Sequence, residues 1–159
     1  MKRFLLIFLT AAMLLSLAAC GGENKSKAPE EMDMEKVYTT LSSSVQLPEM
    51  LELDAGLMLD YCGIRAEDVL QAKVLICADS LRTDEIWLIE AKDETAAKTI
   101  MDLAKNRLEK KGEESITYSP QQYAVVEKAE LLQQGRFIAL LVSPDSAQLA
   151  KLFRKEAGL

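Results

Sequence analysis

The sequence contains no histidine among its 159 residues, and this sets the first limit on its chemistry. Ser-His and Cys-His nucleophile pairs need an imidazole that takes the proton of the nucleophile, so neither pair is available. Zinc sites that use imidazole are excluded for the same reason. The glycines form neither the spacing of a dinucleotide-binding loop nor that of a P-loop. The remaining candidates for chemistry are three cysteines and 25 acidic residues.

Two of the cysteines, Cys62 and Cys77, are expected in the folded part of the chain. An even number of cysteines outside the cytoplasm favours a disulfide bond, provided that the two Cα atoms lie about 4.4–6.8 Å apart. However, Cys77 follows Leu75 and Ile76 in an apolar run, where a cysteine acts as a small apolar side chain. The sequence therefore allows two alternatives, a disulfide bond between Cys62 and Cys77 or two buried free thiols. Neither thiol has a base beside it, and we assign no catalytic residue.

The acidic residues Glu49, Glu52 and Asp54 could supply oxygen atoms to Ca²⁺, which takes about six to eight of them. Their spacing matches no known calcium loop, so we interpret them as solvated side chains. We therefore predict no metal ion and no cofactor. A carboxylate pair that hydrolyses a substrate is an alternative, because Asp and Glu are abundant.

The first twenty residues carry the most specific pattern. A basic pair, Lys2-Arg3, precedes an apolar stretch of 14 residues, Phe4–Leu17. This stretch is shorter than the roughly 20 residues that a membrane-spanning helix needs. The residues Leu17-Ala18-Ala19-Cys20 resemble the lipobox of bacterial lipoproteins. The resemblance implies cleavage between Ala19 and Cys20 and a diacylglyceryl thioether on Cys20, whose two acyl chains would hold the protein to the outer side of the cell membrane.

These observations predict three segments. Residues 1–19 form a lipoprotein signal peptide, residues 20–32 form the lipidated cysteine and a flexible tether, and residues 33–159 form a single domain. Removal of the signal peptide takes away two basic residues, so the net charge changes from −6 to −8. An acidic domain repels phosphate backbones, and we expect no nucleic acid as a partner. The basic run Lys105–Lys111 is interpreted as a solvated helix face.

Apolar residues recur at three- and four-residue spacing in several segments, which predicts helices. Asp33 is the expected N-cap of the first helix, and Pro48 follows its end in a turn, Leu47-Pro48-Glu49-Met50. Gly63 and Gly112 are the expected ends of the second and third helices. The expected helices are residues 34–45, 54–63, 94–111 and 120–127, with a last helix after residue 145.

Two pairs of short apolar segments predict two β-hairpins. The first pair is Lys73–Ala78 with Glu85–Ala91, and the second is Ala129–Gln133 with Arg136–Val142. Two hairpins, each followed by a helix, predict an α+β fold with an antiparallel sheet of about four strands and helices on one face. We expect the N-terminal helices to pack on the other face and shield part of it.

The domain as a whole resembles Gram-positive bacterial lipoproteins that carry a domain of unknown function, the DUF4358 family. The resemblance covers roughly residues 33–157 and depends on short motifs that occur in the same order behind the lipobox. These motifs are Leu47-Pro48-Glu49-Met50 with Leu53-Asp54, Tyr61-Cys62-Gly63-Ile64, Asp84-Glu85-Ile86 and Ala91-Lys92-Asp93. The resemblance implies no activity and no catalytic residues, and it assigns no role to Cys62.

The leading hypothesis from these patterns is a membrane-anchored, non-catalytic interaction or accessory protein of the cell envelope. We expect its partner, a protein or a polymer, to contact an exposed surface that includes Leu47, Pro48, Glu49, Met50 and Trp87. One alternative is a small-ligand receptor associated with a transporter, which needs a pocket near Trp87, Tyr61 or Tyr123. The other alternative is a histidine-free enzyme that uses carboxylates.

Overall fold

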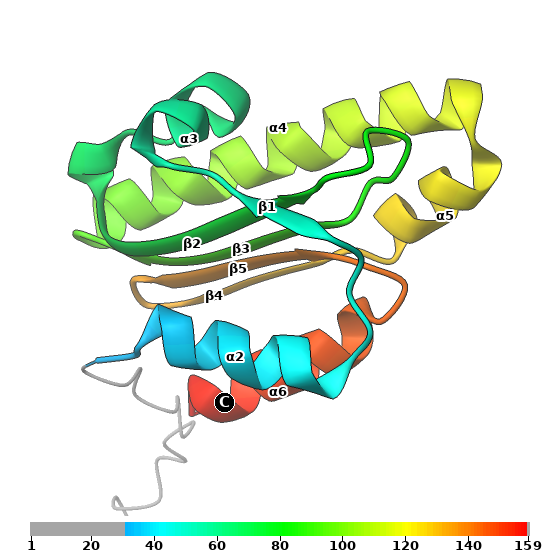
Figure 1. The fold of residues 1–159 in the computed structure, drawn as a ribbon. Coiled ribbons are helices and arrows are strands. Elements are labelled where there is room, and N and C mark those ends of the chain that lie inside the picture. The colour runs from blue at the N-terminus through cyan, green and yellow to red at the C-terminus, as the bar shows by residue number, and fades with distance from the viewer. Residues whose placement is uncertain (1–30, 159) are drawn as a thin grey trace, which may run out of the picture.

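The computed structural model describes residues 31–158, which form a five-stranded antiparallel sheet between two layers of helices (Figure 1). The strands lie in the order β1-β2-β3-β5-β4 across the sheet. The strands are β1 (Met50–Glu52), β2 (Val69–Cys77), β3 (Glu85–Ala91), β4 (Glu130–Gln134) and β5 (Phe137–Val142). The helices are α2 (Met34–Ser44), α3 (Ala55–Cys62), α4 (Glu94–Tyr118), α5 (Pro120–Glu127) and α6 (Ser146–Glu156). A short 3₁₀ turn, Ala66–Asp68, precedes β2.

The α+β prediction is confirmed, with one strand more than the two predicted hairpins supply. The extra strand, β1, falls at the end of the segment that was predicted as a turn, and it pairs with the end of β2 through Met50 opposite Cys77 and Glu52 opposite Leu75. Its flanks continue the pairing, since Leu53 N donates to Val74 O at 2.8 Å. Three residues are too few to show an alternating pattern, so the sequence gives no strand signal there.

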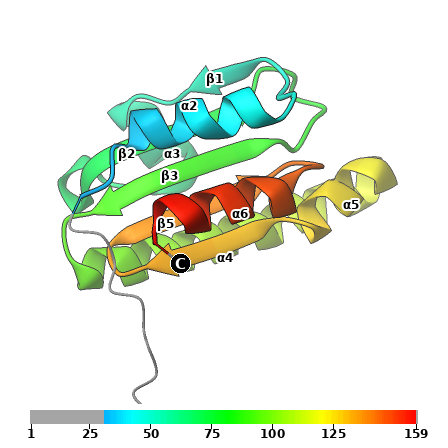
Figure 2. The same ribbon diagram turned by 90° about the horizontal axis from the view of Figure 1, so that it is seen from below.

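Helices cover both faces of the sheet, so the prediction that the helices after the hairpins share one face is wrong. On one face, Trp87 and Ile138 pack with Ile100 of α4 and Met58 of α3. On the other face, the core contains residues from α2, α6 and the alternate positions of β3 and β5. Figure 2 shows α2 and α6 side by side over that second face.

The two central strands explain why both faces need a cover. Every residue of β3 and of β5 is buried, so neither strand has a polar side that water could solvate. An antiparallel sheet with apolar residues on both faces must be packed on both sides. The N-terminal helices do shield the sheet, but of these only α2 covers the face opposite α4, because α3 packs on the same face as α4.

Local signals set the ends of α3. The side chain of Asp54 accepts a hydrogen bond from Leu57 N at 2.9 Å, which satisfies a free N–H group of the first turn. Gly63 ends the helix with φ of 73°, a left-handed conformation that favours glycine. This end of α3 places Cys62 in the core beside the sheet and leaves Tyr61 53% exposed.

Helix α4 is longer than predicted, because it continues through Gly112 to Tyr118. A glycine in a helix interior costs about 1 kcal/mol relative to alanine but does not by itself end the helix. The end comes at Ser119, which is extended (φ −153°, ψ 98°) because the ring of Pro120 disfavours the helical conformation in the residue before it. Among residues 31–158, no helix combines the length and the apolar character that crossing a bilayer requires.

Candidate functional site

A cleft of about 250 Å³ lies where the end of α3, the β2–β3 connection and the second half of α4 meet. We call it the charged cleft, because three basic and two acidic side chains line it. Its lining includes Tyr61 from α3, Arg82 and Asp84 from the β2–β3 connection, and Arg107, Lys111 and Tyr118 from α4.

The spacing of residues along α4 builds one wall of the charged cleft. Arg107, Lys111, Glu114 and Tyr118 follow one another at intervals of four, three and four residues. Residues at these intervals lie on one face of a helix. The wall therefore presents two cations nearest the sheet, then a carboxylate, then an aromatic ring at the rim.

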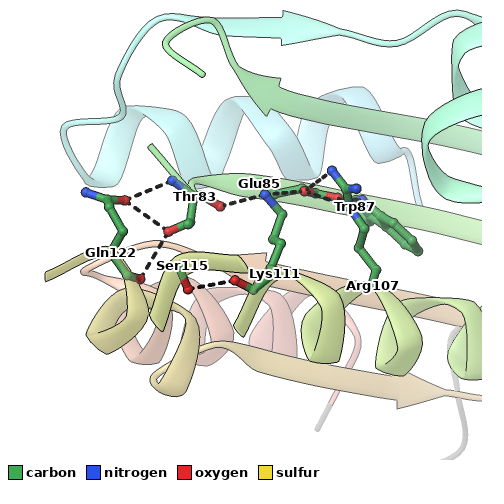
Figure 3. Close-up of polar contacts among 7 residues, drawn as sticks. All are labelled: Thr83, Glu85, Trp87, Arg107, Lys111, Ser115 and Gln122. Atoms are coloured by element: carbon green, nitrogen blue, oxygen red, sulfur yellow. Dashed lines mark hydrogen bonds and ion pairs between the residues drawn. The ribbon is translucent and has the colours of Figure 1, made fainter. Parts of the chain in front are cut away.

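Glu85, the first residue of β3, is fully buried beside this wall and is held by three side chains (Figure 3). Trp87 Nε1 donates to Glu85 Oε1 at 2.7 Å. Arg107 donates through Nε at 3.1 and 3.2 Å to the two carboxylate oxygens and through Nη2 at 3.0 Å to Oε2. Lys111 Nζ lies 2.8 Å from Oε2. Every one of these contacts is a hydrogen bond or an ion pair from a donor group, so the buried carboxylate of Glu85 is fully partnered.

The proton affinities of two groups reflect this environment. Burial, and to a smaller extent the negative charge of Glu85, raises the pKa of the Cys62 thiol to about 12, so the thiol stays protonated at neutral pH. For Arg107, burial alone lowers the pKa, but the hydrogen bond and the charge of Glu85 outweigh it, and the pKa of the guanidinium is raised. Arg107 is therefore a permanent cation in the wall.

The β2–β3 connection is tied to α5, which fixes its position at the cleft. Thr83 N and Thr83 Oγ1 both donate to Gln122 Oε1, at 2.8 and 3.0 Å. Lys111 Nζ donates to Thr83 O at 3.2 Å, so the same ammonium group contacts the connection and Glu85. Figure 3 shows Lys111 between Thr83 and Glu85, with Gln122 on the far side of Thr83.

Asp84 is the exception among these satisfied groups. The residue is 1% exposed, and its Oδ2 accepts from Arg82 Nε at 3.0 Å. Its Oδ1 is buried and has no hydrogen-bond partner in the described part of the chain. An unpaired buried acceptor costs about 1–3 kcal/mol, so this atom calls for an explanation.

The structure corrects one of the predicted surface residues. Trp87 is 0% exposed and lies in the core against α4, so it cannot contact a partner at a surface. Of the other four predicted residues, Glu49 is exposed, while Leu47, Pro48 and Met50 are partly buried. Leu47 and Met50 pack against the core under α2 and α6.

The two cysteines of the domain are both buried and are free thiols in the structure. The alternative of buried thiols therefore describes the structure, and the disulfide bond is not formed. Ala19 and Cys20, the predicted cleavage and lipidation site, lie outside the described residues. The predictions for the signal peptide and most of the tether fall on that part of the chain as well.

The acidic residues weighed as calcium ligands have separate roles. Glu52 pairs with Lys73 Nζ at 2.7 Å, and Asp54 caps α3. Within residues 31–158, no three His, Cys, Asp or Glu side chains gather in a way that could hold a metal ion.

Most of the charged cleft was not predicted from the sequence. The run Lys105–Lys111 was interpreted as solvated, yet the side chains of Arg107 and Lys111 are only 24% and 12% exposed and both contact Glu85. The interpretation holds for Lys105, which is 61% exposed. The available signal was Glu85 directly before the apolar run Ile86–Ile89, together with two cations four residues apart on the following helix. Tyr61, one of three aromatic residues expected near a pocket, does line the cleft.

Comparison with known proteins gives a family but no activity. No curated protein and no solved structure matches the chain. One family model matches residues 43–143, which covers β1 to β5 and all of the charged cleft. The chain therefore belongs to the family described as "Domain of unknown function (DUF4358)".

Proposed function

We propose that the protein is a lipid-anchored protein of the cell envelope, whose α+β domain acts outside the membrane as a non-catalytic interaction or accessory domain. The observation that carries the proposal is the order of segments in the sequence. A basic start, an apolar stretch and Leu17–Cys20 come first, then a polar tether, and then one domain that begins at residue 33. Two acyl chains on Cys20 bind a bilayer stably, whereas a single chain gives only marginal binding.

The charges of the domain support binding over catalysis. A general acid or base must exchange a proton near the working pH. Glu85 is fully buried and its oxygens are occupied by an indole, a guanidinium and an ammonium group, so it has no free path to a substrate proton. Cys62, with a pKa of about 12, holds its proton and makes a poor nucleophile.

The path of the chain supports a partner on the side away from the membrane. The chain enters the domain beside Glu90, because Gln71 Nε2 donates both to Met32 O and to Glu90 Oε2, each at 3.0 Å. The charged cleft begins at Glu85, five residues away along β3, or about 17 Å at the rise of a strand. A tether that reaches the domain at the Glu90 end leaves the cleft end accessible.

Membrane fractionation with an alkyne-labelled fatty acid tests the anchor. Cells expressing the wild-type chain or Cys20→Ser are fed the label, and membrane and soluble fractions are compared. The wild-type protein is expected in the membrane with label, and the variant is expected unlabelled and in the soluble or secreted fraction. Cys62→Ser is the matched control, because it removes a different thiol and should keep the label. Recovery of the wild-type protein in the cytosol contradicts the proposal.

Photo-cross-linking in living cells tests the partner. A photoreactive residue replaces Tyr118, which is 52% exposed at the rim of the charged cleft. The control position is Lys155, which is exposed on α6 across the sheet. An envelope partner should cross-link from position 118 and be lost in Cys20→Ser. Equal cross-linking from both positions would count against a specific interaction.

The alternative of a small-ligand receptor has one observation in its favour, the unpaired oxygen of Asp84 in the wall of the charged cleft.

A further inference from the structure

We infer that the charged cleft binds a small zwitterion, a free amino acid or a short peptide, with the ammonium group of the ligand on Asp84 and the carboxylate on Arg107 and Lys111. The inference goes beyond the proposed interaction role and does not depend on the lipid anchor. Three features of the cleft support it, namely an acceptor without a donor, donors without acceptors, and the size of the space.

The acceptor without a donor is Asp84 Oδ1. It is buried and unpaired, while Oδ2 of the same carboxylate is held by Arg82. An ammonium group satisfies such an oxygen with a charge-assisted hydrogen bond. Arg82 covers this part of the wall, and its side chain is 39% exposed and is bonded to Asp84 through Nε. Its flexible side chain can turn outward and give the ligand access to Asp84.

The donors without acceptors belong to the two cations of α4. Arg107 uses Nε and Nη2 on Glu85, and within residues 31–158 its Nη1 has no acceptor. Lys111 divides its ammonium group between Glu85 Oε2 and Thr83 O, so one of its three N–H bonds is free. A carboxylate is the natural acceptor for a guanidinium and an ammonium group that lie together on one wall.

The mixture of charges selects a ligand that carries both signs. A simple cation would meet Arg82, Arg107 and Lys111, and a simple anion would meet Asp84 and Glu114. A zwitterion places each of its charged groups against the opposite sign, which is how complementary charges give specificity. The two half-exposed rings of Tyr61 and Tyr118 leave room at the rim for an apolar part of the ligand.

The size of the space limits the ligand to about one or two residues. The cleft of about 250 Å³ lies below the range of about 300–1,000 Å³ that is usual for drug-sized ligands. The rigid frame of the cleft also favours binding, since Thr83 is fixed to Gln122 and the cations are fixed to Glu85.

Isothermal titration calorimetry of the purified full chain in detergent tests the inference. The probes are the common amino acids, tested singly, and the dipeptide Ala-Ala, at up to about 10 mM. At least one probe is expected to bind. Tighter binding of Ala-Ala than of any single amino acid identifies a peptide as the source of the zwitterion, and the reverse identifies a free amino acid. Absence of binding by every probe overturns the inference.

Ligand analogues test which groups are recognised without any change in the protein. For the best probe, the N-acetyl form lacks the ammonium group and the methyl ester lacks the carboxylate. Both are expected to bind about tenfold more weakly or worse, because each leaves buried charges unpaired. Equal affinity for the probe and both analogues contradicts the inference even if every protein variant fails to fold.

Two variants then place the ligand in the cleft. Asp84→Asn keeps the shape of the side chain and removes its charge, so the affinity should fall about tenfold or more. Asp102→Asn is the matched control, since Asp102 lies on the exposed side of α4 and pairs with Lys105. Wild-type affinity in Asp84→Asn overturns the assignment. Cys20→Ser should leave the titration unchanged, so a failure of the anchor and a failure of this site are separate results.

Discussion

The two ends of strand β3 carry the same kind of group in different surroundings. Glu85 at the cleft end and Glu90 at the other end are both buried carboxylates, and each pairs with arginine. The cations of Glu85 are themselves shielded, with side chains 24% and 12% exposed, whereas Arg136 beside Glu90 is 39% exposed. We therefore expect the hydration of the cation, more than the burial of the carboxylate, to determine how much the stability of the folded state depends on each pair.

The largest expected effect is at the cleft end. Glu85→Gln removes the charge that neutralises Arg107 and Lys111, and it should lower the free energy of unfolding by about 3–5 kcal/mol, the usual cost of breaking a buried pair. Urea denaturation followed by circular dichroism measures the change. Glu109→Gln on the exposed side of α4 is the control and should change little. A loss below that of Glu90→Gln would reverse the comparison between the two ends.

The other end of β3 should be less sensitive. Glu90→Gln should lower the free energy of unfolding by only about 2 kcal/mol. Water can solvate Arg136 when its partner loses its charge, and Gln71 can still donate a hydrogen bond to the oxygen of the new amide. The same denaturation experiment gives this value. A cost equal to that of Glu85→Gln would mean that burial of the carboxylate alone decides the outcome.

A smaller effect is expected from the indole that holds Glu85. Trp87→Phe removes the 2.7 Å hydrogen bond to Glu85 Oε1 and leaves Arg107 as a second donor to that oxygen, so the cost should be about 1–2 kcal/mol. The double variant Trp87→Phe with Glu85→Gln should lose less free energy of unfolding than the sum of the losses of the two single variants, because both substitutions remove the same hydrogen bond. Strict additivity would show that the indole N–H contributes nothing through Glu85.

The smallest effect concerns a carboxylate near the Glu90 end whose cations are open to water. The hydrogen bonds of Lys92 and then of Arg65 hold the pKa of Asp68 below its ordinary value of 3.8. A pKa that is lower in the folded state stabilises the fold above pH 3.8, and this contribution is lost as the pH falls through the folded value. The melting temperature of the wild-type protein should therefore decline between pH 6 and pH 2, and the decline should be shallower in Asp68→Asn. Identical pH profiles would exclude a role for this group.

Local sequence signals predicted the elements well, and long-range contacts account for what they missed. The N-cap at Asp33, the left-handed Gly63 and the Ser119-Pro120 start of α5 all act within a few residues, so they could be found from the sequence. The pairing of β3 with β5 and the placement of α4 and α6 on opposite faces depend on contacts across the whole domain.

The charged cleft was missed for the same reason. Glu85 and Arg107 are 22 residues apart, and only the crossing of α4 over the sheet brings them together. In the sequence alone, Arg107 belongs to a basic run with helical spacing, and such a run is usually solvated. Trp87 shows the opposite error, because an aromatic residue in an apolar strand was assigned to a surface that α4 covers.

The place of β5 in the sheet has a consequence for the order in which the chain can fold. This strand is among the last to be synthesised, yet it lies between β3 and β4 and is buried along its whole length. Helix α6 follows it, and Ala157 beyond that helix is 0% exposed in the same core as Leu41 near the start of the domain. Helix α2 thus has no complete surface to pack on until β5 and α6 have been synthesised. Such an arrangement delays complete folding, which suits the export across the membrane that we propose.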